Sequence, residues 1–157
     1  MNTVLTLHDP ATARRYYEQG LWRPDTFYSL MRGHAEARPD AWALRDGARR
    51  ITWRELLAWT DALAADLHGS GVVQGQRVSL WTSNRIESVI GLLASARNGY
   101  VCNPSLHLNY TGEEITALLQ RIRAAAVIAE EGYGAASPAV LDGIAALPAM
   151  KRVYRLP

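Results

Sequence analysis

Apolar side chains recur every three or four residues in six stretches of the chain, which is the spacing of amphipathic helices. Several of these stretches open with a residue that can cap a helix, and proline or glycine closes others. We therefore expect helices over about residues 10–19, 26–37, 52–69, 84–98 and 111–122, and a further helix from 138.

Three of the expected helices begin with a short polar residue followed three positions later by a glutamate. In this capping box the two side chains each satisfy a free backbone N–H of the first helical turn. The pairs are Thr52 with Glu55, Thr111 with Glu114 and, as a weaker version, Asn84 with Glu87.

Short apolar runs lie between these helices at residues 77–81, 100–102, 125–129 and 152–156. Strands that alternate with helices favour βαβ units and a mainly parallel sheet with helices on both faces. A separate pair of strands, 41–45 and 48–51, flanks Asp46-Gly47, a strong hairpin-turn signal. The predicted fold class is α/β, with an N-terminal helix and lead-in over 1–25 and one α/β unit over 26–157.

The composition fits one globular unit: 157 residues, 48% hydrophobic and 20% charged. The longest uncharged stretch, residues 88–96, is about half the length of a membrane-spanning helix, and no secretory signal pattern opens the chain. The single cysteine, Cys102, excludes an internal disulfide and indicates a cytoplasmic protein.

The charge pattern argues against a nucleic-acid partner. The net charge is +2 and the arginines are dispersed, without a basic stripe or an aromatic ladder beside one. Lys151 is the only lysine, and we expect it to be a solvated charge. Abundant arginine and alanine indicate a GC-rich bacterial genome.

The segment 130–137 allows two interpretations. It lies between an expected strand and an expected helix and contains Gly132-x-Gly134, as a phosphate-binding loop would. However, Ser137 stands where a third glycine is expected, and Glu130 and Glu131 would repel a phosphate. An ordinary strand-to-helix turn is the favoured interpretation.

The remaining residues of chemical interest suggest packing roles. We expect Cys102 to be a small buried hydrophobe and His34 to be a partly buried packing residue. The histidines are too scattered for a metal site, and the tryptophans are expected in the core or at subdomain contacts, although Trp22 could line a pocket in a longer protein. The histidines are His8, His34, His68 and His107, and the tryptophans are Trp22, Trp42, Trp53, Trp59 and Trp81.

Eight short motifs, in order, resemble the N-terminal portion of the AMP-forming acid–CoA ligases of the adenylate-forming superfamily. They are ALRDG (43–47), ITWREL (51–56), GV (71–72), GQRVSL (75–80), GLLA (91–94), NP (103–104), YT (110–111) and EEI (113–115). The likeness runs from about Trp22 to the end of the chain. The stretch 17–22 is similar to members that activate aryl or cyclic acids.

This resemblance implies a parent enzyme that uses ATP, Mg²⁺ and coenzyme A to convert a carboxylic acid into its CoA thioester through an acyl-adenylate. The family's Ser/Thr/Gly-rich phosphate loop and its later nucleotide motifs are not in this segment, and Lys151 matches neither lysine motif. We therefore expect no catalytic residue and no metal ligand here, and we assign no cofactor-binding residue. A contact between Arg85 and a coenzyme A phosphate is a minor alternative.

Two functional interpretations remain open. The chain is either a non-catalytic N-terminal piece of an acid–CoA ligase or a free-standing nucleotide or acyl-CoA binding module. The first predicts the rest of the parent enzyme as partner, together with self-association through exposed apolar surface. The family's acid pocket lies mostly outside this segment, so the sequence does not select the acid.

Overall fold

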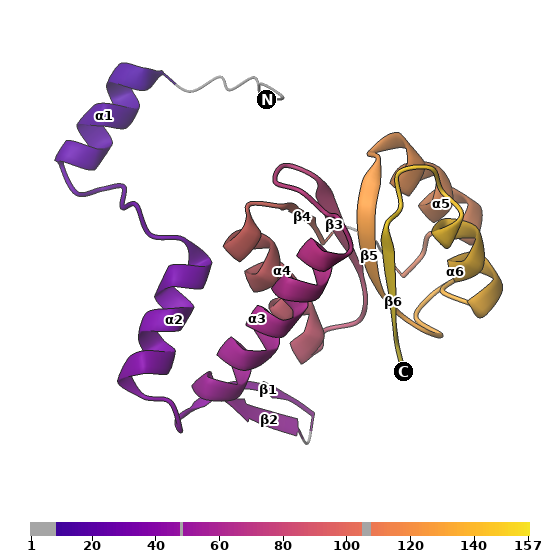
Figure 1. Ribbon diagram of the computed structural model, residues 1–157, viewed down its shortest axis with the longest axis horizontal. Helices are drawn as coiled ribbons and strands as arrows, with labels where there is room; N and C mark the ends of the chain where they lie inside the picture. The colour runs from indigo at the N-terminus through magenta and orange to yellow at the C-terminus, as the bar shows by residue number, and fades with distance from the viewer. Residues whose placement is uncertain (1–8, 48, 105–107) are drawn as a thin grey trace.

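A four-stranded parallel sheet forms the centre of the protein in a computed structural model that describes residues 9–47, 49–104 and 108–157 (Figure 1). The strand order is β4-β3-β5-β6. The strands are β3 (Arg77–Trp81), β4 (Val101–Asn103), β5 (Ala124–Glu130) and β6 (Arg152–Leu156). The predicted α/β class and its mainly parallel sheet are confirmed.

Helices cover both faces of this sheet. On one face lie α3 (Trp53–Gly69) and α4 (Ile86–Asn98), and on the other lie α5 (Gly112–Arg121) and α6 (Pro138–Ala145) (Figure 1). Successive residues of β5 alternate between the two cores: Val127 packs with the α5–α6 side, and Ile128 packs with the α3–α4 side. Helices on both faces explain why nearly all of β5 is buried and apolar.

Helix α4 lies unusually close to the sheet because a glycine faces it. A Cβ added at Gly91 would come within 2.7 Å of a Leu80 methyl and 3.1 Å of an Ile128 methyl. This close approach is a packing role for the glycine in the motif GLLA, at residues 91–94.

The segment before β3 forms two further helices and a hairpin. Helix α1 (Pro10–Glu18) stands apart from the sheet, whereas α2 (Phe27–Ala37) packs against α3 and α4 (Figure 1). Strands β1 (Trp42–Asp46) and β2 (Arg49–Thr52) pair antiparallel. Asp46 pairs with Arg49, so the turn of the hairpin is shifted by one residue toward the C-terminus relative to the predicted Asp46-Gly47 turn. Ala48 lies outside the described residues.

The expected helix starts are correct except one. Asp9, Thr52, Thr111 and Ser137 cap α1, α3, α5 and α6 through their side chains. Asn84 does not cap α4: the N-cap residue is Arg85, which makes no side-chain cap bond. This prediction was wrong because the first N–H of α4 is bonded by a residue distant in the sequence, Asp46, and not by a residue next to the helix.

Trp81 is fully buried, as expected for a core tryptophan, whereas Trp22, Trp42 and Trp59 are more than two-fifths exposed, so contacts with further subdomains stay a prediction for these three. One packing prediction needs correction. His34 is exposed rather than partly buried, and its ring lies against that of Trp53 with centroids 4.8 Å apart. Apolar residue type alone does not specify which side of a helix or hairpin is covered.

Candidate functional site

The carboxyl ends of β3 and β5 meet at the place where ligands commonly bind in open α/β sheets. The chain leaves β3 toward β4 on one side and later leaves β5 toward β6 on the other. At such a reversal of direction the connections diverge and leave a crevice outside the strand ends. The residues that follow β3 and the last residue of β5 are therefore the first candidates for a functional site.

In this protein a side chain of the chain itself joins the carboxyl ends of β3 and β5. Glu130, the last residue of β5, accepts a 2.7 Å hydrogen bond at Oε2 from the backbone N–H of Ser83, just after β3. Its other oxygen lies 3.3 Å from Arg85 Nη1. Burial alone would raise the pKa of Glu130, but the hydrogen bonds from Ser83 and the charge of Arg85 outweigh burial and lower it.

Arg85 connects this crevice to a network of ion pairs formed by Asp46, Arg49, Arg85, Glu87 and Glu130. Its side chain is only 12% exposed, and its Nε lies 2.8 Å from Glu87 Oε2. Its Nη1 also donates to the backbone oxygen of Pro157 at 2.9 Å, which ties the residue after β6 to the start of α4. The bond to Glu87 raises the pKa of Arg85, so the guanidinium is permanently charged.

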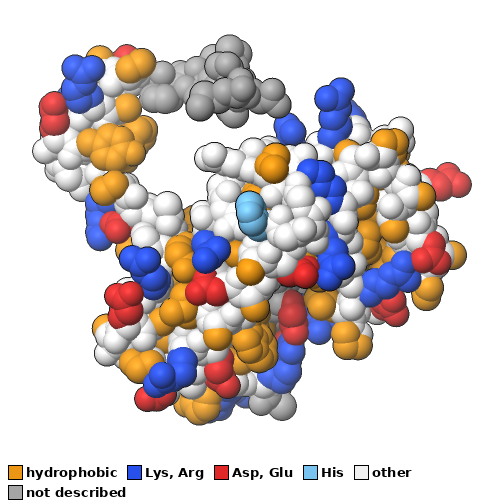
Figure 2. Space-filling view, in the orientation of Figure 1, with side chains coloured by type: hydrophobic (Ala, Val, Ile, Leu, Met, Phe, Trp, Pro, Cys, Tyr) orange, Lys and Arg blue, Asp and Glu red, His pale blue; other side chains and the backbone are white. Residues whose placement is uncertain are grey.

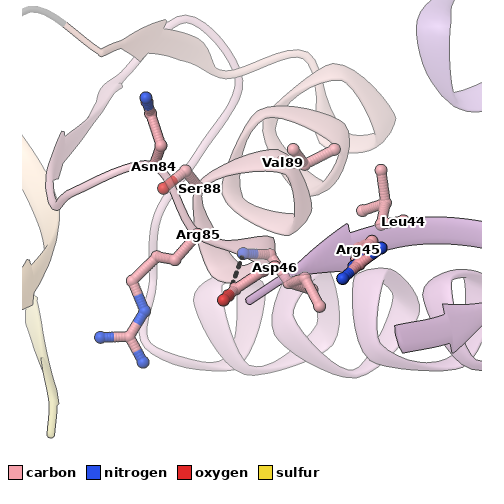
Figure 3. A pocket seen from close by; sticks show the side chains of 8 residues that line it. Leu44, Arg45, Asp46, Asn84, Arg85, Ser88 and Val89 are labelled. Carbon is pink, nitrogen blue, oxygen red and sulfur yellow. Dashed lines mark hydrogen bonds between the residues drawn. The ribbon is translucent and has the colours of Figure 1, made fainter. Parts of the chain in front are cut away.

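The hairpin completes the network from the opposite side. Arg49 Nη1 lies 2.7 Å from Glu87 Oε1, and Arg49 also pairs with Asp46. Asp46 Oδ2 in turn accepts a 3.1 Å hydrogen bond from the N–H of Ile86, the first residue of α4 (Figure 3). Asp46 thus supplies, from forty residues away, the cap that Asn84 was expected to give.

These contacts lower the pKa of the network's carboxylates. The pKa of Glu87 falls to about 2, chiefly through its bond with Arg49. The pKa of Asp46 is lowered first by the Ile86 N–H and then by Arg49. With Glu130, three carboxylates surround two arginines, so the cluster is ionised near neutral pH and carries a net negative charge.

A cavity of about 250 Å³ lies between the hairpin and the start of α4. Figure 3 shows the hairpin side chains Leu44, Arg45 and Asp46 on one side and α4 residues on the other, with Arg85 extending away from Leu44. Its lining residues are Leu44, Arg45, Asp46, Asn84, Arg85, Ile86, Ser88 and Val89. The charged residues of this lining are two arginines, Arg45 and Arg85, and one carboxylate, Asp46.

The remaining sequence candidates lie away from the crevice. Lys151 Nζ, expected to be free in solvent, donates to the Gly71 carbonyl and, at 3.0 Å, to Gln76 Oε1. These residues precede β3 and β6 and therefore lie at the amino end of the parallel sheet, opposite the crevice. Cys102 is half-buried in β4, and burial raises the pKa of its thiol, so it is a weak nucleophile.

The glycine pair after β5 forms a closed turn. Gly132 and Gly134 both have positive φ, and the Gly132 N–H donates to the Ala136 carbonyl at 3.0 Å. A Cβ at Gly134 would come within 2.6 Å of the Leu108 carbonyl oxygen, so backbone occupies the space beside this turn. His8 and His107 lie outside the described residues.

The donors at the ends of β3 and β5 that could contact a phosphate are already engaged. Phosphate transfer needs cations or aligned N–H groups at the phosphates, and here the Ser83 N–H and Arg85 are already bonded to Glu130. Within residues 9–47, 49–104 and 108–157, no three His, Cys, Asp or Glu side chains are grouped so that they could hold a metal ion. In the same ranges no helix is both long and apolar enough to cross a membrane.

Sequence reasoning missed the network but contained a signal for it. Ser83 and Arg85 follow one predicted strand, and Glu130 directly follows another, so a parallel sheet must bring them to one edge. The roles of Asp46 and Arg49 had no comparable signal, because the position of the hairpin relative to α4 is set by tertiary packing.

The fold and the motifs point to one protein family. The sequence pattern of the family described as "AMP-binding enzyme" matches residues 31–155, and the chain belongs to that family.

Its relatives include full-length acid–CoA ligases and shorter proteins. The chain is 38% identical over 120 residues to 3-[(3aS,4S,7aS)-7a-methyl-1,5-dioxo-octahydro-1H-inden-4-yl]propanoyl:CoA ligase of Mycobacterium tuberculosis, covering 76% of this chain and 23% of that one. It is 32% identical over 128 residues to the uncharacterized protein Rv1549 of the same species, covering 80% and 73%.

A solved structure confirms the part of the fold that this chain represents. The N-terminal domain of FACL13 from Mycobacterium tuberculosis superposes with a TM-score of 0.70 at 21% identity, over 83% of this chain and 34% of that one. The architecture is thus that of the N-terminal part of adenylate-forming enzymes. The chain spans about a quarter of the M. tuberculosis ligase.

Proposed function

We propose that this chain is the N-terminal scaffold of an AMP-forming acid–CoA ligase and that it does not itself adenylate a carboxylic acid. The observation that carries the proposal is that Glu130 already engages the Ser83 N–H and Arg85 at the ends of β3 and β5, the donors that an anionic ligand would need there. The family membership and the M. tuberculosis ligase support the parent reaction.

The chemistry of adenylation requires free cations or N–H groups at the phosphates. A carboxylate attacks the α-phosphate of ATP, and pyrophosphate leaves with the electrons of the broken bond. The enzyme must stabilise negative charge on the phosphates with Mg²⁺, lysine or backbone N–H groups. Here the one lysine is bonded at the opposite end of the sheet, and the Arg85 guanidinium beside the crevice is already paired with the Glu130 carboxylate.

ATP–pyrophosphate exchange tests the catalytic part of the proposal. The 157-residue chain is assayed with a panel of aryl, cyclic and linear carboxylic acids, and the M. tuberculosis ligase serves as the active reference. We expect no exchange above the blank for any acid. Exchange with a single acid above that level contradicts the proposal.

The alternative of a binding module is tested by titration calorimetry with ATP, AMP and coenzyme A. A scaffold gives no heat with any of the three, whereas a module binds at least one in the micromolar range. The variant Glu130→Gln is a matched control, because it removes the blocking charge and leaves the size of the side chain unchanged. If Glu130 blocks binding, the variant binds at least one of the three ligands more tightly than the natural chain does. Equal affinities of the two proteins contradict a blocking role for Glu130.

The scaffold role includes a partner and a cellular location. We propose that the rest of the parent ligase covers exposed apolar side chains, some of which are visible over α1 in Figure 2. Two others, Phe27 and Leu30, line an apolar cavity of about 400 Å³. We also propose a cytoplasmic location, consistent with one half-buried thiol. Because the M. tuberculosis ligase is named for a bicyclic acid, a cyclic acid is the first substrate to test with the full parent enzyme.

A further inference from the structure

The two ends of the parallel sheet differ in charge. Helices α4, α5 and α6 connect successive parallel strands, so their first turns lie at the carboxyl end of the sheet and their last turns at the amino end. The acidic residues of α4 and α5, which are Glu87, Glu113 and Glu114, all lie in first turns, whereas the last turns carry Arg97 and Arg121. In Figure 1 the C label marks the carboxyl end, and Figure 2 shows Lys and Arg side chains projecting at the opposite, upper end.

Three arginines at the amino end have no described carboxylate partner. Arg77 is the first residue of β3, Arg121 is the last residue of α5, and Arg123 directly precedes β5. All three side chains are exposed, and none of them forms an ion pair with a residue that the structure describes. By contrast Arg152, the first residue of β6, lies 3.1 Å from Asp66 Oδ2.

The strand register brings two of these arginines and Lys151 together. Arg77 pairs with Ala124, and Arg123 precedes Ala124, so the two arginines lie at adjacent strand starts. Since β5 lies between β3 and β6, Lys151 reaches past the start of β5 when its Nζ donates to Gln76 Oε1 at 3.0 Å. Both acceptors of this ammonium are neutral oxygens. Positive charge therefore gathers here without being neutralised by the described residues.

The backbone of Arg123 gives a reason to look for a use of its side chain. Its φ of 51° is the one positive φ of a non-glycine residue in the part of the chain that the structure describes. Glycine adopts this left-handed region without steric cost, whereas a residue with a Cβ is strained there. Turn geometry thus favours glycine at this position, and the guanidinium is what arginine adds.

Two exposed valines lie next to these cations. Val73 is 56% exposed and Val101 is 49% exposed. The Val73 N–H donates at 3.0 Å to Gln76 Oε1, the same oxygen that accepts from Lys151. Val101 pairs with Arg77 in the register of β3 and β4. The amino end of the sheet therefore combines unpaired cations with protruding aliphatic side chains.

We propose that the amino end of the sheet is a peripheral docking surface for a bilayer that contains anionic phospholipids. The negative potential of such a bilayer attracts lysine and arginine side chains, and exposed apolar side chains enter the boundary between headgroups and acyl chains. The cytoplasmic leaflet carries anionic lipids, which agrees with the proposed location. The surface lies opposite the crevice, so the docking role and the scaffold role can fail independently of each other.

The valines favour a bilayer over a nucleic acid as the partner. A phosphate backbone attracts the cations equally well but leaves Val73 and Val101 in water, whereas a bilayer buries them. Surfaces for single-stranded nucleic acids instead present aromatic rings on which the bases stack.

Vesicle cosedimentation of the 157-residue chain tests the surface. Vesicles of phosphatidylcholine with about one third phosphatidylglycerol are compared with vesicles of phosphatidylcholine alone, and only the first are expected to bind. The double variant Arg77→Gln/Arg123→Gln removes two charges from the surface. Arg14→Gln/Arg50→Gln is the matched control, because it removes two charges from exposed arginines of α1 and β2 that also form no ion pair with a described residue.

Each cation near an anionic bilayer contributes about fivefold to the partition coefficient. We therefore expect the surface variant to bind about twentyfold more weakly than the unsubstituted chain, and the control to bind less than about twofold more weakly. Equal losses in the two variants mean that net charge alone attracts the chain, and they overturn the proposal. Equal binding of the unsubstituted chain to both kinds of vesicle overturns it as well.

Arg123→Gly separates binding from folding. Glycine suits the positive φ of this position, so the thermal midpoint should not fall, while vesicle binding should weaken about fivefold. Unchanged vesicle binding of this variant contradicts the proposal.

Val73→Ser and a DNA duplex distinguish the bilayer from a nucleic acid. Loss of the apolar side chain should weaken vesicle binding about threefold at unchanged charge, and the duplex should not compete with the vesicles. A duplex that binds with the same dependence on Arg77 and Arg123, together with no effect of Val73→Ser on vesicle binding, assigns the surface to nucleic acid and overturns the proposal.

Discussion

The helices α4 and α5 begin in contrasting ways, although their sequences look alike at the start. In α5 the cap is local: the Thr111 N–H donates to Glu114 Oε2 at 2.8 Å, and the Glu114 N–H donates back to Thr111 Oγ1 at 3.2 Å. In α4 the first N–H donates to Asp46 in the hairpin, and Glu87 pairs with two arginines instead of capping. The glutamate three residues after each predicted cap thus closes a turn in one helix and joins three elements in the other.

This difference shows which parts of the protein depend on each other. The free backbone N–H groups at the start of α5 are bonded by residues within the same four-residue segment, so removing this cap should affect only the first turn of α5. The start of α4 connects the hairpin, β5 and the residue after β6, so its loss should spread to all of them. Substitutions in the two regions test this contrast directly.

The largest effect is expected from Glu87→Gln. The side chain is 22% exposed and bonds Arg49 and Arg85, and both bonds weaken when its charge is removed. Hydrogen bonds to charged groups are worth more than neutral ones, and we expect the free energy of unfolding to fall by about 2 kcal/mol. Urea denaturation measures this change.

Glu113→Gln is the matched control for that experiment. Glu113 lies in the first turn of α5 and is exposed, so the same chemical change should alter the free energy of unfolding by less than about 0.5 kcal/mol. Equal losses in the two variants would contradict the distinction between a connecting and a local glutamate.

Acid should selectively remove the contribution of Glu87. Its pKa is about 2 in the folded protein and 4.5 in the unfolded reference, so the unfolded state binds more protons between these values. The contribution, on the order of 2 kcal/mol, is complete above about pH 5 and disappears as the pH falls toward 2.

Comparison with Glu87→Gln over pH 2–7 separates this effect from general acid denaturation. The difference in unfolding free energy between the unsubstituted chain and the variant should shrink steadily as the pH falls. A difference that stays constant with pH would show that Glu87 acts through packing rather than through its charge.

The two caps give an intermediate effect that can be compared by hydrogen exchange. Thr111→Ala removes a local cap and should cost about 1 kcal/mol, with faster amide exchange confined to the first turn of α5. Asp46→Ala removes the remote cap, so exchange should accelerate in α4 and also in the hairpin, because Arg49 loses one of its two partners. Acceleration confined to α4 would refute the coupling between these elements.

The same contrast explains how far the sequence could predict the structure. Thr111 and Glu114 are three residues apart, so their cap could be recognised from spacing alone, as could the strands of the parallel sheet. Asp46 and Ile86 are forty residues apart, and the sequence identified Asp46 only as a turn former. The arrangement of Arg85 and Glu130 follows from two parallel strand ends, but their mutual bonding depends on side-chain geometry that no spacing encodes.

The smallest effect is expected from Lys151→Gln, at the other end of the sheet. The ammonium is exposed and bonds the Gly71 carbonyl and Gln76, so its attraction is screened by water. We expect the free energy of unfolding to change by less than about 0.5 kcal/mol, and the change should not depend on pH between 3 and 7, since no carboxylate is involved. Urea denaturation at both pH values measures it. A loss comparable to that of Glu87→Gln would mean that the amino end of the sheet also holds separate elements together, and the contrast between a connected and an unconnected end would no longer stand.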